Sequence, residues 1–107
     1  MISSKIIQAI NEAEKYPYIV RVGIFGSHAR RDETALSDVD VIIDYDNSSD
    51  EFLDNLDDFM TDFENIITTK VDYVTMRGIM KSKDADFREE VLREVKWVYE
   101  ASNLKRH

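Results

Sequence analysis

The sequence predicts an α+β (mixed α/β) fold, a small mixed sheet with helices packed on one side. Short runs rich in β-branched and aromatic residues alternate with longer segments whose apolar residues recur at helical spacing. The expected element order is α-β-α-β-α-β-α. A chain of 107 residues has room for one such domain, residues 1–107, and its 43% hydrophobic content with only three Gly and one Pro is typical of globular proteins.

The first four elements are predicted within residues 4–45. A helix over about residues 4–16 follows from the helical spacing of its isoleucines, and Pro17 ends it because the residue before a proline avoids the α region. Residues 18–25 and 38–45 are rich in β-branched residues and predict two strands. The polar segment between them has little apolar content, so we expect a short helix that begins at Ser27, followed by a loop.

A long helix is expected after Ser48, which has capping-box spacing to Glu51. Its apolar stripe consists of Phe52, Leu53, Leu56, Phe59, Met60 and Phe63. Its opposite face is acidic, with Asp50, Glu51, Asp54, Asp57, Asp58, Asp62 and Glu64. The simplest interpretation of that face is a solvated surface, and the alternative is a surface that binds a partner.

Residues 70–76 predict a third strand, and residues 77–85 a connector with room for one helical turn. The last helix is expected over about residues 86–101, where six apolar residues lie on one stripe: Phe87, Val91, Leu92, Val95, Val98 and Tyr99. Such a stripe belongs to a core or, as the alternative, to a partner interface.

Charge and composition exclude several classes of function. The 22 acidic and 14 basic residues give a formal charge of -8, which opposes direct binding to nucleic acid or to anionic membranes. There is no cysteine, so disulfides and thiolate metal sites are absent. Neither a signal peptide nor an apolar run of the roughly 20 residues needed to cross a bilayer is present, and we expect a cytoplasmic protein.

Three carboxylates are candidate metal ligands. Asp38 and Asp40 project from the same face of the second predicted strand, because side chains alternate along a strand. Adjacent anions repel unless a cation lies between them, and Mg²⁺ favours carboxylate and phosphate oxygens. Asp72, near the start of the third strand, could join them, and three carboxylates suit two metal ions that catalyse phosphoryl transfer. Asp44, further along the same face, is expected to be a solvated strand end.

A candidate phosphate site precedes these carboxylates. Gly26 allows close approach of a backbone, and the free N–H groups of a helix that begins at Ser27 would receive an anion. Arg30, one helical turn later, could stabilise a triphosphate. Arg31 and His28 are weaker candidates, and His28 is expected to be a surface residue.

The stretch GIFGSHARRDETALSDVDVII resembles the Gly-Ser-x10-Asp-x-Asp signature of the DNA polymerase β-like nucleotidyltransferase superfamily. The small size resembles its minimal, MNT-type branch. The resemblance implies the polymerase β-like palm fold, with Gly26 and Ser27 as the phosphate-binding pair. It also implies Asp38, Asp40 and Asp72 as catalytic, metal-binding carboxylates. Arg30 matches an arginine common in the family's loop, whereas Arg31 stands where the family often has glycine.

The same resemblance implies a partner and a reaction. Members of the branch are typically encoded beside a small HEPN-domain protein, and the best-known pairing is an MntA-like antitoxin with a HepT-like RNase toxin. The nucleotidyltransferase then transfers AMP from ATP, with two Mg²⁺ ions, to a tyrosine of the toxin. Two alternatives remain: a non-catalytic antitoxin that neutralises the toxin by binding alone, and an enzyme that modifies a small molecule.

Overall fold

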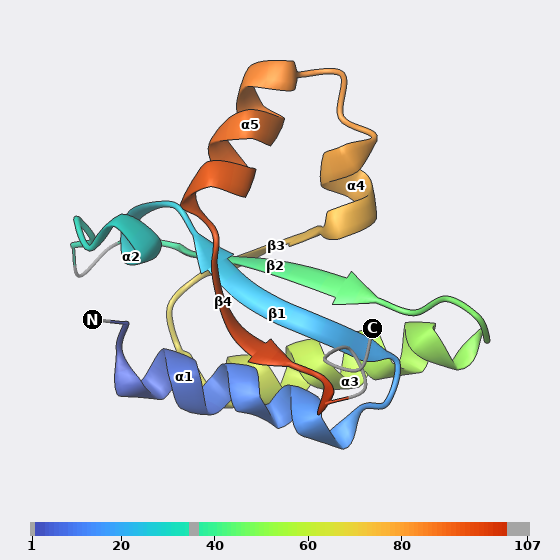
Figure 1. The fold of residues 1–107 in the computed structure, drawn as a ribbon. Coiled ribbons are helices and arrows are strands. Elements are labelled where there is room, and N and C mark those ends of the chain that lie inside the picture. Colours follow the sequence, from blue (N-terminus) through green and yellow to red (C-terminus); the bar gives the residue numbers. More distant parts are fainter. Residues whose placement is uncertain (1, 35–36, 103–107) are drawn as a thin grey trace.

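A four-stranded mixed sheet forms the centre of the molecule (Figure 1). The computed structural model describes residues 2–34 and 37–102. The strands are β1 (Ile19–Phe25), β2 (Val39–Tyr45), β3 (Val71–Thr75) and β4 (Lys96–Glu100). Their spatial order is β3-β2-β1-β4. β1 pairs antiparallel with β2 and with β4, and β2 pairs parallel with β3.

The helices connect these strands. They are α1 (Ser4–Asn11), which continues into the 3-10 turn η1 (Glu12–Lys15), and then α2 (Ser27–Arg30), α3 (Glu51–Ile66), α4 (Met76–Met80) and α5 (Ala85–Glu94). The predicted capping box is wrong: α3 begins at Glu51, and the Ser48 N–H donates to the Asp46 side chain instead. Within the described ranges, no helix is long and apolar enough to cross a membrane.

The main core lies between the sheet and the pair α1 and α3, which lie side by side beneath it in Figure 1. Alternate residues of the two central strands face these helices and are at most 1% exposed: Val22, Ile24, Val39, Val41 and Ile43. From α3, Phe59 and Phe63 are completely buried against them. Each such large side chain stabilises the fold by about 1.5–3 kcal/mol relative to an exposed position.

A second, smaller cluster covers part of the opposite face of the sheet. Phe25 and Ile42 point there because they alternate with the residues of the main core, and they pack with Ile79 of α4 and Val91 of α5. The α+β class is confirmed, but the expectation that helices pack on one side only is wrong. Ile42 is completely buried, so the aspartate-bearing face of β2 also required an apolar cover.

The predicted C-terminal helix is wrong in its second half. α5 ends at Glu94, and residues 96–100 form β4, which pairs with β1 and closes that edge of the sheet. The apolar residues of this segment obey both helical and alternating spacing, and backbone pairing with β1 decided the outcome. Gly23 permits the close approach, because a Cβ there would lie 2.7 Å from the Lys96 carbonyl oxygen.

Arg31 ends α2 in the left-handed conformation, with φ 66° and ψ 30°. Side chains with a Cβ are disfavoured in this region, which glycine enters freely. The chain thus adopts a glycine-like backbone at Arg31 with a residue that has a Cβ.

Arg31→Gly is therefore expected to raise the free energy of unfolding by about 0.5 kcal/mol, since relief of the left-handed strain exceeds the added entropy of the unfolded chain. Urea denaturation of the variant and the parent measures this. Arg31→Ala is the control, because it removes the arginine but keeps the Cβ. An equal gain in both variants would contradict the backbone explanation.

Tyr16 ties the end of η1 to α3, since its hydroxyl donates a hydrogen bond to the Asp62 carboxylate. This bond, together with partial burial, raises the pKa of Tyr16 to about 12. The protonated hydroxyl is thus favoured in the folded state. The contribution of the hydrogen bond to the free energy of unfolding is therefore complete below the ordinary pKa of 10 and is lost as the pH rises towards 12.

Tyr16→Phe should lower the free energy of unfolding by about 1 kcal/mol at pH 7, and the difference from the parent should shrink between pH 10 and 12. Denaturant titrations across this pH range measure both effects. Tyr18→Phe serves as the control, because no side-chain hydrogen bond of the Tyr18 hydroxyl is seen among residues 2–34 and 37–102. A pH-independent difference would argue against the hydrogen bond as its source.

Candidate active site

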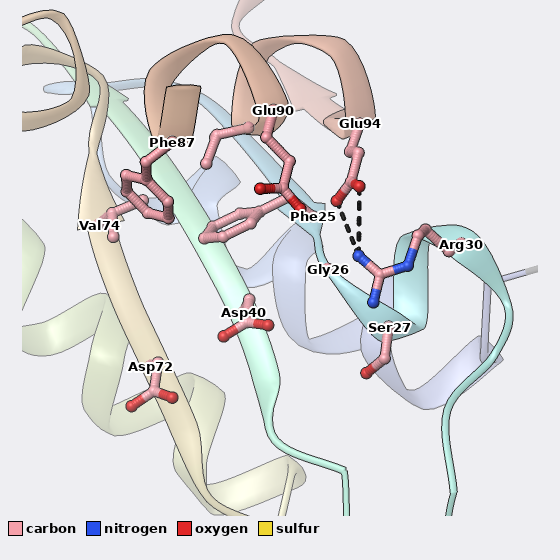
Figure 2. A pocket seen from close by; sticks show the side chains of 11 residues that line it. Phe25, Gly26, Ser27, Arg30, Asp40, Asp72, Val74, Phe87, Glu90 and Glu94 are labelled. Carbon is pink, nitrogen blue, oxygen red and sulfur yellow. Dashed lines mark hydrogen bonds and ion pairs between the residues drawn. The ribbon is translucent and has the colours of Figure 1, made fainter. Parts of the chain in front are cut away.

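A cavity of about 440 Å³ opens where the sheet, α2 and α5 meet (Figure 2). Five of the six predicted site residues line it: Gly26, Ser27, Arg30, Asp40 and Asp72. They come from three separate segments of the chain, the β1–α2 turn, β2 and β3. The cavity is therefore the meeting point of the motifs that the sequence singled out.

Asp40 and Asp72 are directly opposite one another in the parallel pairing of β2 with β3. Residues in register share a face of the sheet, and Figure 2 shows both carboxylates on the cavity side. Burial raises the pKa of Asp40, the negative charges of Asp72 and Asp38 raise it further, and Arg30 is among the groups that lower it. The two strands thus hold carboxylates close enough to repel one another.

Gly26 lies against Asp40 and leaves room for its side chain. Its φ of 75° is in the left-handed region, and a Cβ at this position would overlap with Oδ2 of Asp40. Ser27 then begins α2, and no side chain caps the start of that helix. Gly26 is therefore needed both for the turn and for the close approach of the backbone to a carboxylate.

Asp38 is the predicted residue that the structure does not bring into the cavity. It immediately precedes β2, its side chain is 41% exposed, and its Oδ2 lies 3.8 Å from the Lys70 ammonium. Oδ1 of Asp72 lies at the same distance from Lys70, which therefore stands between the two carboxylates. Lys70 was not among the site residues predicted from the sequence, although it lies two residues before Asp72. That spacing places both side chains on one face of a strand.

The donor set suits a hard divalent cation, because carboxylate oxygens are the ligands that Mg²⁺ prefers. Asp40 and Asp72 are paired in register on neighbouring strands. The Lys70 ammonium already lies 3.8 Å from both Asp38 and Asp72. In the described part of the chain, however, no three His, Cys, Asp or Glu side chains are arranged to hold a metal ion. The residues fit the ion by chemistry, and Asp38 would have to turn away from Lys70 to join the other two.

α5 supplies a wall of the cavity that was not predicted. Phe87, Glu90 and Glu94 line it, and Phe87 retains 39% exposure. The Arg30 guanidinium bonds to both oxygens of Glu94, at 2.9 and 3.2 Å, and to Asp32 at 3.1 Å. The 64-residue separation of Arg30 and Glu94 explains why no sequence spacing indicated this pair.

Two other predicted residues lie outside the cavity. Asp44 is ion-paired with Arg21 at 3.2 Å at the far end of β2. His28, expected at the surface, is half-buried, and its buried Nε2 has no hydrogen-bond partner among residues 2–34 and 37–102. His28 lines a separate pocket of about 180 Å³ between α1 and the α3–β3 loop.

Comparisons with known proteins agree with this geometry. The family model "Polymerase beta, Nucleotidyltransferase" matches residues 6–104. A search of curated proteins found no match. Among solved structures, a proposed minimal nucleotidyltransferase is 28% identical with a TM-score of 0.63, over 84% of this chain and 86% of that one.

Two complexes are also similar in fold. One is a toxin-antitoxin with AMP-PNP, at 18% identity and a TM-score of 0.61, over 95% of this chain and 76% of that one. The other is a tri-AMPylated HEPN toxin with its MNT antitoxin from Shewanella oneidensis, at 17% identity and a TM-score of 0.53, over 95% and 72%. With the family model matching nearly the whole sequence, the chain belongs to the polymerase β nucleotidyltransferase family.

Proposed function

We propose that this protein transfers AMP from ATP to a hydroxyl, with a tyrosine favoured, of a partner HEPN-type RNase toxin, and so acts as its antitoxin in the cytoplasm. The observation that carries the proposal is the pairing of Asp40 with Asp72 beside the Gly26–Ser27 turn in one cavity. In a family of nucleotidyltransferases, this is where reacting phosphate oxygens are expected.

The charge of the cavity supports dependence on Mg²⁺. Its described lining contains the carboxylates of Asp40, Asp72, Glu90 and Glu94 against the single guanidinium of Arg30. Such a cavity repels a bare triphosphate, so the nucleotide should enter together with divalent cations. Asp38, Asp40 and Asp72 would hold two Mg²⁺ ions, which supply the positive charge that stabilises the attacking and leaving oxygens.

The β1–α2 turn would receive the phosphates. The backbone N–H groups of the first turn of α2, which no side chain caps, and the Ser27 hydroxyl would donate to phosphate oxygens, and Arg30 is a cationic group on the same wall. Asp72, the more exposed of the two paired carboxylates, would assist removal of the acceptor's proton. The hydroxyl oxygen then attacks the α-phosphate, and pyrophosphate leaves.

Fold neighbours that are toxin-antitoxin complexes support an acceptor that lies on a partner protein. Complexes of HEPN toxins with MNT antitoxins share this fold, and in one of them the toxin is AMPylated. These neighbours support, for this chain, a HEPN-domain toxin as partner and ATP as nucleotide.

Asp40→Asn is expected to reduce AMP transfer by at least about 100-fold, because the amide cannot supply the negative charge that holds a metal ion. The measurement is transfer of label from α-labelled ATP, with Mg²⁺, to the product of the neighbouring gene. Asp44→Asn is the matched control, since it changes the same residue type on the same face of β2 outside the cavity. Full activity of Asp40→Asn would refute the assignment.

Mass measurement of the partner after co-expression separates catalysis from neutralisation by binding alone. The proposal expects the partner's mass to rise by one or more AMP units with the parent protein and to stay unchanged with Asp40→Asn. A partner that is inhibited yet unmodified by the parent protein would instead identify a non-catalytic antitoxin.

Lys70→Met is expected to tighten Mn²⁺ binding about two- to fivefold, because an exposed lysine competes only weakly for Asp38 and Asp72. Electron paramagnetic resonance of Mn²⁺ titrated into the protein measures this without turnover. Lys96→Met removes the same charge from β4 and controls for overall electrostatics. Weaker Mn²⁺ binding in Lys70→Met would show that Lys70 supports the site rather than competing for it.

A further inference from the structure

The guanidinium of Arg30 is held by carboxylates from two different parts of the chain. Its Nε donates to Asp32 Oδ2 at 3.1 Å, and its Nη1 donates to Glu94 Oε1 and Oε2 at 2.9 and 3.2 Å. Figure 2 shows the other terminal nitrogen, Nη2, turned toward Ser27. Two of the three guanidinium nitrogens, Nε and Nη1, therefore have carboxylate partners, and Nη2 is turned toward the wall on which the phosphates are expected.

Glu94 is the more firmly placed member of this pair. Its side chain is 17% exposed, against 44% for Arg30. It is the last residue of α5, and the backbone around it is fixed by a 2.9 Å hydrogen bond from the Val95 N–H to the carbonyl of Val91, which is itself 1% exposed. Glu94 thus acts as the anchor, and the longer arginine side chain is the group that is positioned.

We propose that Glu94 is a positioning residue, which holds Arg30 so that Nη2 meets the β- and γ-phosphates of the bound nucleotide. The inference rests on the proposed function. A free arginine side chain loses rotamer freedom when it binds a ligand, and an arginine already held by Glu94 has lost that freedom before the nucleotide arrives. Glu94 therefore strengthens binding of a triphosphate, although its own charge is negative.

Glu94 could instead weaken the binding of a triphosphate, and this alternative makes the proposal testable. A carboxylate on Arg30 could compete with the phosphates, and its charge alone repels them. If competition dominated, removing the charge would strengthen binding of ATP. If the Arg30–Glu94 pair only held α5 against α2, its loss would weaken the binding of all nucleotides equally. Positioning alone predicts weaker binding that is confined to ligands with β- and γ-phosphates.

The experiment measures affinity for a non-hydrolysable ATP analogue and for AMP, with Mg²⁺, in the full chain. Glu94→Gln should weaken binding of the analogue about fivefold or more and leave AMP unchanged. Glu90→Gln is the matched control: it removes the same charge from the same wall, and no ion pair of Glu90 is seen among the described residues. This control should bind the analogue at least as tightly as the parent, because it removes repulsion alone.

A double-mutant cycle tests whether Glu94 acts through Arg30. In an Arg30→Met background, Glu94→Gln should no longer weaken binding of the analogue, since there is no guanidinium left to position. Tighter or unchanged binding in Glu94→Gln, equal losses for the analogue and AMP, or a loss that persists without Arg30 would each overturn the inference. A parent protein that binds no nucleotide with Mg²⁺ would overturn the proposed function, and the inference with it.

Discussion

The alternation of side chains along β2 is the constraint on which the rest of the structure depends. Val39, Val41 and Ile43 face α1 and α3 and are at most 1% exposed, while Asp40 lies between them on the other face. A shift of one residue in the pairing of β2 would bury Asp40 and expose three core residues, so the hydrophobic core itself specifies where the carboxylate points. The same packing that stabilises the fold therefore fixes the site.

The two faces of the sheet have different energetic roles. The face toward α1 and α3 carries most of the apolar burial, with Phe59 and Phe63 at its centre. The other face holds the Asp40 carboxylate, whose pKa is raised first by burial and then by the negative charges of Asp72 and Asp38, so the charged form of this site opposes folding. The small cluster around Ile42 and Val91 is next to this charged region and brings α5 over the cavity.

Local signals predicted most of the fold and the chemical types at the site. Helical spacing located α1 and α3, β-branched runs located β1, β2 and β3, and the Gly-Ser and Asp-x-Asp motifs were recognisable because each depends on neighbours a few residues away. The prediction of a helix for residues 96–100 was wrong because the apolar residues there fit both helical and alternating spacing. Pairing with β1, more than 70 residues earlier, selected the strand.

The sequence by itself determined which residues could serve as ligands, since side-chain chemistry and strand alternation are properties of the chain alone. Only the tertiary structure decided which of them meet. The register between β2 and β3 set Asp40 opposite Asp72. Asp38 lies apart from this pair, at an exposed position beside Lys70. The packing of α5 brought Glu94 into contact with Arg30. The place of Asp72 near the start of its strand had already indicated the first of these contacts. The contact of Glu94 with Arg30 depends on helix packing between distant segments, for which the spacing of residues along the chain carries no signal.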